Sequence, residues 1–166
     1  MLILILAGCT TDIQKTTTSL SLNEKVLEVA REQLGAPYIF GSRGPNSFDC
    51  SGLITYSYKK AYGRDKIFNV DSWITDDATI QDLYDWNVQL IPLSKINPGD
   101  IIFMTREKDK VTHGGLFIKW EEKYKKFKFI HASSLADEVT IDTWFINNMD
   151  RELRFVDAGR FEASYK

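Results

Sequence analysis

The strongest constraint on the fold of this chain is a change of pattern near Asp100. Before that residue, apolar side chains recur at helical spacing, whereas after it short β-branched and aromatic runs follow one another with brief links. Helices followed by a series of strands are typical of an α+β domain, in which the helices pack on an antiparallel β-sheet. We predict strands at residues 101–105, 112–121, 125–132, 139–143 and 153–161.

The first predicted helix begins after Ser21. Ser21 and Glu24 have the spacing of a capping box, apolar residues then recur through Leu34, and Gly35 ends the pattern. Between this helix and the next, residues 36–49 are rich in Pro and Gly, which predicts a loop.

A second helix is predicted from Cys50 to Ala61, with Asp49 as its N-cap and Gly63 at its end. Further along, residues 75–86 contain a predicted short helix, and residues 90–98 read as extended chain that enters a turn.

Size and charge exclude several classes of protein. The chain has 166 residues, of which 43% are hydrophobic, and this is the size of a single domain with a substantial core. It carries 21 basic and 23 acidic residues, so we expect no nucleic-acid partner. The two cysteines and two histidines have no metal-ligand spacing, and we expect neither a metal nor another cofactor.

Residues 1–9 have the pattern of a secretory signal. An uncharged apolar run from Leu2 is followed by the small residues Ala7 and Gly8 directly before Cys9. The string Leu6-Ala7-Gly8-Cys9 resembles the bacterial lipoprotein signal, in which the cysteine is lipidated and becomes the new N-terminus. No Lys or Arg precedes Leu2, so a plain apolar terminus is the alternative. We expect Cys9 to carry lipid and residues 10–21 to form a flexible tether, which implies a membrane-anchored protein of the cell envelope.

Cys50 is the candidate nucleophile. It stands at the start of the second predicted helix, where unpaired N–H groups and the helix dipole favour a thiolate and should lower the thiol pKa. The next residue but one, Gly52, leaves room for another backbone to approach closely. The alternative is a buried structural thiol.

The two histidines, His113 and His131, both lie at predicted strand positions with small neighbours. Gly114 and Gly115 follow the first, and Ala132 follows the second. The parity of the two positions is consistent with both rings facing one side of adjacent strands. His113 would then act as base on Cys50, and His131 would orient His113.

Five strings follow one another along the chain: Leu34-Gly35-Ala36-Pro37-Tyr38-Ile39-Phe40-Gly41, Phe48-Asp49-Cys50-Ser51-Gly52-Leu53, Asn97-Pro98-Gly99-Asp100-Ile101-Ile102-Phe103, His113-Gly114-Gly115-Leu116-Phe117-Ile118 and Phe129-Ile130-His131-Ala132-Ser133-Ser134. In these strings and in their order the sequence resembles the NlpC-type bacterial cell-wall peptidases, a branch of the papain-like cysteine peptidases. The similarity covers about residues 22–161, and we therefore expect residues 22–166 to form an NlpC-type catalytic domain. Ser42 and Gly114 depart from the family pattern, which often has a second Gly at the first position and a β-branched residue at the second.

The resemblance implies a papain-like fold and a role for each matching residue. Cys50 would be the nucleophile, His113 the general base and His131 the third polar residue. Tyr38 would form a wall of the active site and donate a hydrogen bond. Asp49 and Ser51 would border the substrate groove.

The activity that the resemblance implies is hydrolysis of amide bonds in peptidoglycan stem peptides, typically between D-glutamate and the following diamino acid, through an acyl-enzyme. We expect a monomer whose partners are peptidoglycan peptides and, through the lipid, a membrane. Two alternatives remain open: a papain-like amidase or acyltransferase acting on another amide, and a non-catalytic cell-wall binding module.

Overall fold

The computed structural model describes residues 20–146 and 152–164 of the chain. The predicted signal segment 1–9 with Cys9, and most of the predicted tether 10–21, lie outside the described residues. Among the residues that are described, no helix has the length and apolar character needed to cross a membrane.

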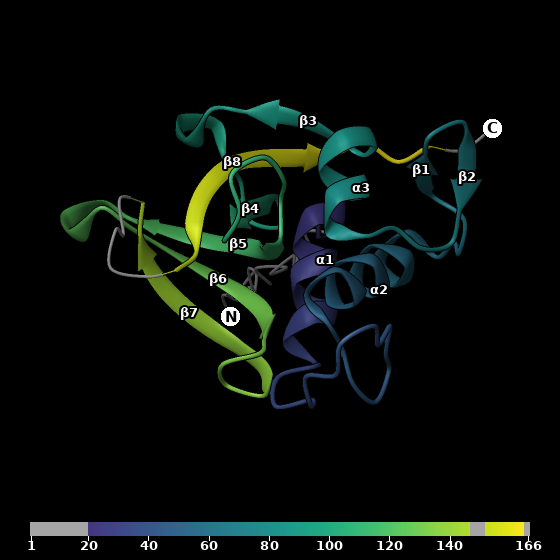
Figure 1. Ribbon diagram of the computed structural model, residues 1–166, viewed down its shortest axis with the longest axis horizontal. Coiled ribbons are helices and arrows are strands. Elements are labelled where there is room, and N and C mark those ends of the chain that lie inside the picture. Colours follow the sequence, from purple (N-terminus) through teal and green to yellow (C-terminus); the bar gives the residue numbers. More distant parts are fainter. Residues whose placement is uncertain (1–19, 147–151, 165–166) are drawn as a thin grey trace, which may run out of the picture.

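An antiparallel six-stranded sheet and three α-helices make up most of the fold (Figure 1). The strand order is β3-β8-β4-β5-β6-β7, so the last strand in the sequence lies inside the sheet, between β3 and β4. In Figure 1 the sheet and the pair α1 and α2 lie side by side, which confirms the predicted α+β class. The strands of this sheet are β3 (Val88–Ile91), β4 (Ile101–Thr105), β5 (His113–Glu121), β6 (Lys126–Ser133), β7 (Glu138–Phe145) and β8 (Arg154–Phe161).

The first helix, α1 (Leu22–Arg31), begins as predicted but ends earlier than expected. Ser21 and Glu24 form a complete capping box at its start. The predicted end at Gly35 was wrong because the chain turns away to pair with β7. The Gly35 N–H donates to the Val139 carbonyl at 2.9 Å, and the Val139 N–H donates to the Ala36 carbonyl at 2.8 Å.

The second helix, α2 (Cys50–Tyr62), begins at Cys50 as predicted. Asp49 is its N-cap and accepts a hydrogen bond from the Gly52 N–H, while Gly63 ends the helix in the left-handed conformation. A Cβ atom on Gly52 would lie 2.1 Å from the carbonyl oxygen of Ser42. The loop of residues 36–49 therefore crosses directly over the first turn of α2, and the close approach predicted at Gly52 is confirmed.

The middle of the chain was the part least accessible to prediction. The short helix expected within residues 75–86 is α3 (Ile80–Trp86). A two-stranded hairpin of β1 (Phe68–Val70) and β2 (Trp73–Thr75) was not predicted, because each strand has only three residues and their pairing is local. The extended chain expected at 90–98 is replaced by the end of β3 and a 3₁₀ turn, η1 (Leu93–Lys95). Another 3₁₀ turn, η2 (Glu122–Tyr124), links β5 to β6.

The core lies on both faces of the sheet, and β4 is buried along its whole length. Ile101 and Phe103 of this strand point toward the helices, where they join Leu53 and Ile54 of α2. The alternate residues of β4 point to the opposite face and pack with aromatic residues of β5, β6 and β7. Because β4 pairs with β5, the first residue of β5 starts from a rigid, fully packed support.

Candidate active site

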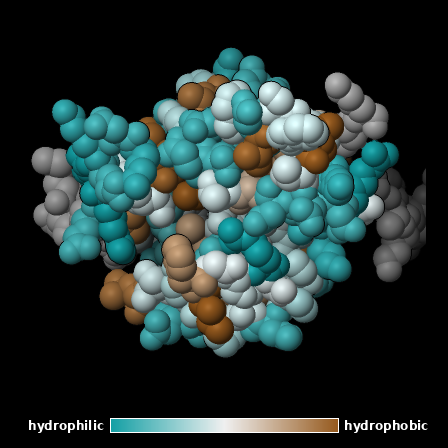
Figure 2. All heavy atoms as spheres, turned by 45° about the vertical axis from the view of Figure 1, so that its right-hand side comes forward, coloured by the Kyte–Doolittle hydropathy of each residue, from teal (hydrophilic) through white to brown (hydrophobic). Residues whose placement is uncertain are grey.

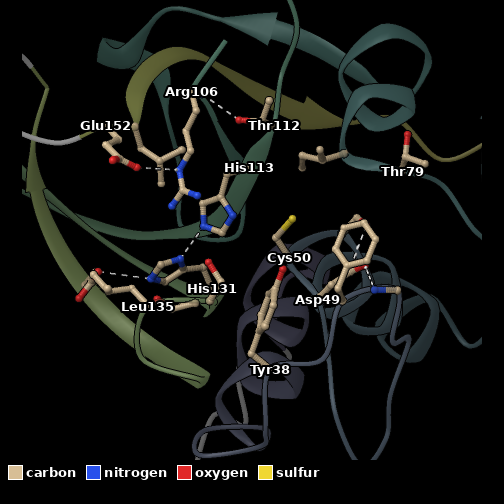
Figure 3. Close-up of a pocket in the computed structure, with 18 of the residues that line it drawn as sticks. Tyr38, Asp49, Cys50, Thr79, Arg106, Thr112, His113, His131, Leu135 and Glu152 are labelled. Carbon is tan, nitrogen blue, oxygen red and sulfur yellow. Dashed lines mark hydrogen bonds and ion pairs between the residues drawn. The ribbon is translucent and has the colours of Figure 1, made fainter.

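Cys50 is the first residue of α2 and lines a pocket of about 860 Å³ between the helices and the sheet. It is a free thiol and is partly exposed. Figure 3 shows the Cys50 sulfur in the pocket that His113 also lines. The helix start and the strand start thus bring the predicted nucleophile and the predicted base into one cavity.

The two histidines contact each other through their ring nitrogens. His113 is the first residue of β5 and His131 lies on β6, and Nε2 of His113 is 2.7 Å from Nδ1 of His131. A Cβ atom on Gly115 would lie 2.7 Å from Cδ2 of Phe129 and 3.0 Å from the Cβ of His131, so the missing side chain lets β6 approach β5 closely. The prediction that both rings face one side of adjacent strands is confirmed.

Gly114 departs from the family pattern, and the structure gives the reason. A Cβ atom at this position would lie 2.5 Å from Cδ1 of Ile80, the first residue of α3. Ile80 is almost fully buried and lines the pocket. A residue of α3 therefore occupies the space that a side chain on β5 would need.

Beyond His131 lies Asp142, which sequence reasoning missed. Its Oδ2 atom is 3.4 Å from Nε2 of His131 and accepts a hydrogen bond of 3.1 Å from Nε1 of Trp144. β7 pairs with β6 so that Asp142 stands opposite Phe129, two positions from the partner of His131. The register between β6 and β7 brings the Asp142 carboxylate next to His131. No short sequence motif around Asp142 indicates this contact.

Burial determines the protonation states of Cys50 and His113 in the absence of substrate. Burial and, to a smaller extent, the negative charge of Asp49 raise the pKa of the Cys50 thiol to about 11. Burial also lowers the pKa of the His113 imidazole to about 3, with a smaller contribution in the same direction from His131. The expected lowering of the Cys50 pKa was therefore wrong, because the loss of water around the sulfur outweighs the N–H groups near it. At neutral pH the pair is a thiol beside a neutral imidazole.

Asp49 is brought to the pocket wall, but its carboxylate is already engaged. Oδ1 accepts from the Gly52 N–H at 2.6 Å and from Ser51 Oγ at 3.0 Å. Oδ2 accepts from the Gly41 N–H at 3.0 Å and from Arg43 Nη1 at 2.6 Å. Asp49 thus ties the loop to the helix start, and Ser51 helps to hold it.

Arg43 was also missed by sequence reasoning. Besides its contact with Asp49, its Nε donates to Asp77 Oδ2 at 2.7 Å. One guanidinium therefore joins the loop of residues 36–49 to the segment that precedes α3. Both of these segments line the pocket.

Tyr38 stands on the opposite side of the thiol from the histidines. Its backbone pairs with Phe48 and with Asp137, and its hydroxyl is directed toward Cys50 (Figure 3). Burial raises the pKa of the phenol, and Cys50 contributes in the same direction, so the hydroxyl stays protonated at neutral pH. Tyr38 thus lines the pocket, and its role as a hydrogen-bond donor stays a prediction.

Arg106 supplies a second cation to the pocket and was not predicted. Its side chain extends from the end of β4 toward His113 (Figure 3). Its Nε lies 3.9 Å from Oε2 of Glu152, and both side chains are exposed, at 51% and 88%. Such a loose, solvated ion pair is weak, so the guanidinium is available to another anion.

The mouth of the pocket has an apolar rim. Phe40 and Leu135 both line the pocket, and they are 88% and 89% exposed. Figure 2 shows that, on the face it presents, apolar side chains form small groups separated by hydrophilic residues.

In the part of the chain that the structure describes, no group of three or more His, Cys, Asp or Glu side chains is placed to hold a metal ion.

Comparison with known proteins identifies the family. The model of the NlpC/P60 family matches residues 35–156, which is most of the chain. The chain belongs to the NlpC/P60 family. It is 30% identical over 119 residues to the gamma-DL-glutamyl hydrolase of Bacillus subtilis, covering 70% of this chain and 24% of that protein. It is 28% identical over 144 residues to the probable peptidoglycan endopeptidase LytE of the same organism, covering 87% of this chain and 36% of that protein. The chain thus spans about a quarter to a third of these relatives.

Solved structures of NlpC/P60 proteins share the fold. NlpC2 from Trichomonas vaginalis superposes with a TM-score of 0.63 at 24% identity, over 89% of this chain and 50% of that chain. RipD from Mycobacterium tuberculosis, described as a non-catalytic NlpC/P60 protein adapted to peptidoglycan binding, has a TM-score of 0.57 at 17% identity, over 86% of this chain and 98% of that chain. The fold therefore serves both hydrolases and binding proteins, and the residues of the site must decide between them.

The raised pKa of Cys50 predicts slow alkylation at neutral pH. Because iodoacetamide reacts with the thiolate, modification of the peptide that contains Cys50 should accelerate only as the pH approaches about 11. Mass spectrometry of that peptide, after reaction over a pH series, measures the titration separately from Cys9. The same chain unfolded in guanidinium chloride serves as the reference and should titrate near the ordinary value of about 8.5. A folded-state inflection at or below that reference would contradict the burial argument.

Proposed function

We propose that this NlpC/P60 protein is a cysteine endopeptidase that hydrolyses peptidoglycan stem peptides between D-glutamate and the following diamino acid. The observation that carries the proposal is the group of three residues in one pocket, which Cys50, His113 and His131 all line and in which His113 contacts His131 at 2.7 Å. The peptidoglycan substrate is supported by the resemblance to LytE, and the glutamyl side of the bond by the resemblance to the gamma-DL-glutamyl hydrolase.

Acylation begins from the neutral pair. Nε2 of His113 is occupied by His131, which leaves Nδ1 to accept the proton of the Cys50 thiol as the sulfur attacks the peptide carbonyl carbon. The carbonyl oxygen becomes an oxyanion, and the Cys50 N–H at the start of α2 would stabilise it. The imidazolium then gives its proton to the leaving amine, the C–N bond breaks, and a thioester remains on Cys50.

Deacylation repeats the same proton transfers with water. His113 takes a proton from a water molecule, the hydroxide attacks the thioester carbon, and the sulfur leaves and recovers the proton from His113. The products are a carboxylate and an amine, and the enzyme returns to its resting state. Charge separation occurs only during the reaction, which fits a thiol and an imidazole that are both largely shielded from water.

Arg106 gives the site a means of selecting its substrate. In the free enzyme its positive charge helps to lower the pKa of His113 and so opposes the uptake of the thiol proton. A carboxylate bound to Arg106 would neutralise that charge and make His113 a better base. The free α-carboxylate of a γ-glutamyl residue has the required charge, and Arg106 would bind it by a charge-assisted hydrogen bond.

The remaining parts of the proposal concern location. Lipid on Cys9 would hold the enzyme at the membrane, with residues 10–21 as a tether and residues 22–166 as the catalytic domain beside the cell wall. The NlpC/P60 family is associated with the cell envelope through its peptidoglycan substrate. We propose that the enzyme acts there as a monomer.

Digestion of peptidoglycan tests the proposed activity. The wild-type chain should release fragments whose masses correspond to cleavage after D-glutamate, whereas Cys50→Ala should release none above the no-enzyme background, because it lacks the nucleophile. Liquid chromatography with mass spectrometry of the soluble products measures both. Fragments cut at the amide between sugar and peptide would favour the amidase alternative. If the wild-type chain binds peptidoglycan but releases no cleaved fragments, the binding-module alternative would be favoured.

Substitution of Arg106 tests the substrate preference. Arg106→Gln should lower kcat/KM for a γ-D-glutamyl peptide with a free α-carboxylate by about tenfold to a hundredfold, the value of a charge-assisted hydrogen bond. It should leave kcat/KM for the matching α-amide peptide nearly unchanged. Arg31→Gln, at an exposed position on α1 outside the pocket, is the matched control and should change neither. Equal decreases in kcat/KM for both peptides would show that Arg106 does not recognise the α-carboxylate.

A further inference from the structure

The polar contacts of the active site continue past the three predicted residues to the edge of the sheet. From His113 on β5 they pass to His131 on β6 and then to Asp142 on β7. We propose that Asp142 is a positioning residue, which fixes the tautomers of both histidines and thereby directs the lone pair of His113 Nδ1 at Cys50. The inference deepens the proposed cysteine peptidase function and rests on it for its catalytic meaning.

The first step concerns the environment of His131. Its side chain is only 2% exposed, and its ring packs against Phe129 and Trp144 at centroid distances of 4.7 and 6.3 Å. Nε2 is buried and makes no hydrogen bond of good geometry within the described residues, while a carboxylate oxygen of Asp142 lies 3.4 Å away. Asp142 is 35% exposed, so water reaches its side chain while Oδ2 lies next to the buried ring.

The second step follows from the chemistry of a carboxylate. An ionised carboxylate only accepts hydrogen bonds, so a lone pair on Nε2 of His131 facing it would be repelled, whereas an N–H there is attracted. Asp142 therefore places the proton of neutral His131 on Nε2. Nδ1 of His131 then carries a lone pair.

In the third step, the tautomer of His131 determines the tautomer of His113. Since Nδ1 of His131 accepts, the 2.7 Å contact requires that Nε2 of His113 donates. Nδ1 of neutral His113 then carries a lone pair and faces the pocket that holds Cys50. The opposite tautomers would present an N–H to the thiol, and His113 could not accept its proton.

Trp144 holds the carboxylate in place. Its indole N–H donates to the same oxygen, Oδ2, that approaches His131, at 3.1 Å. Trp144 is 5% exposed and packs edge to face on Phe129, so the donor is fixed by the core on that face of the sheet. The direction of Asp142 therefore depends on packing remote from the thiol.

Nitrogen NMR of the imidazole rings measures the tautomers without any substrate. The chain has only two histidines, so a full chain labelled with ¹⁵N-histidine and purified without a histidine tag gives four ring signals. At pH 8, the signals of both rings should be those of an imidazole that carries its proton on Nε2. In Asp142→Asn, signal from His131 protonated at Nδ1 should appear.

Two NMR results would overturn the proposal. One is a wild-type His131 protonated at Nδ1. The other is an Asp142→Asn protein whose tautomers match those of the wild type. Because neither spectrum depends on catalysis, both remain informative if the proposed peptidase activity proves wrong.

Kinetics link the tautomers to the reaction. Asp142→Asn should lower kcat by about tenfold to a hundredfold, the range for outer partners that orient a metal-bound histidine. The loss should be smaller than the roughly 10⁴-fold loss for a carboxylate that contacts the catalytic histidine directly. KM should change little, and Asp142→Glu should recover part of kcat. Glu138→Gln, an exposed acid on the same strand, is the matched control and should keep wild-type kcat. An Asp142→Asn enzyme with altered tautomers and unchanged kcat would show that the tautomers do not limit the reaction.

Discussion

The buried carboxylate of Asp49 is the interaction on which the helical half of the active site depends. It is 5% exposed, and its two oxygens accept hydrogen bonds from four donors. A buried carboxylate is costly unless it is paired and hydrogen-bonded, so these donors cannot be removed one at a time without penalty. The same group caps α2, holds the loop of residues 36–49 against it and thereby fixes Cys50 at the pocket. Gly52 completes the arrangement, because only a residue without a side chain fits beneath the loop.

The sheet supplies the other half of the site through its register. β4, buried on both faces, supports the start of β5, and the pairing of β5, β6 and β7 brings His113, His131 and Asp142 into one line. Burial keeps both Cys50 and His113 in their neutral forms at rest. We therefore propose that the fold orients His113 to accept the Cys50 proton, and that charge develops on these two residues only when the sulfur attacks the substrate.

Much of this arrangement was predictable from local sequence. The capping box at Ser21, the Asp49 cap and the left-handed Gly63 mark helix ends through short-range chemistry, and five family strings identify Cys50, His113 and His131. No local sequence feature distinguishes Asp142, Arg43 or Arg106 from the many other acidic and basic residues of the chain. Their place in the site follows only from tertiary contacts. The pKa of Cys50 was predicted with the wrong sign for a related reason. The helix start is visible in the sequence, whereas the burial of the sulfur results from a loop and a sheet that lie far apart in the chain.

The central claim is that Cys50 forms a covalent acyl-enzyme, and mass spectrometry can test it directly. A synthetic stem peptide is mixed with the full chain for milliseconds to seconds, quenched in acid to preserve thioesters, and the enzyme is digested and mapped. The account predicts a transient added mass, equal to the acyl fragment that ends in D-glutamate, on the peptide that contains Cys50. Release of the same product with the added mass on another residue, or with no covalent intermediate at any time during the first turnover, would contradict it.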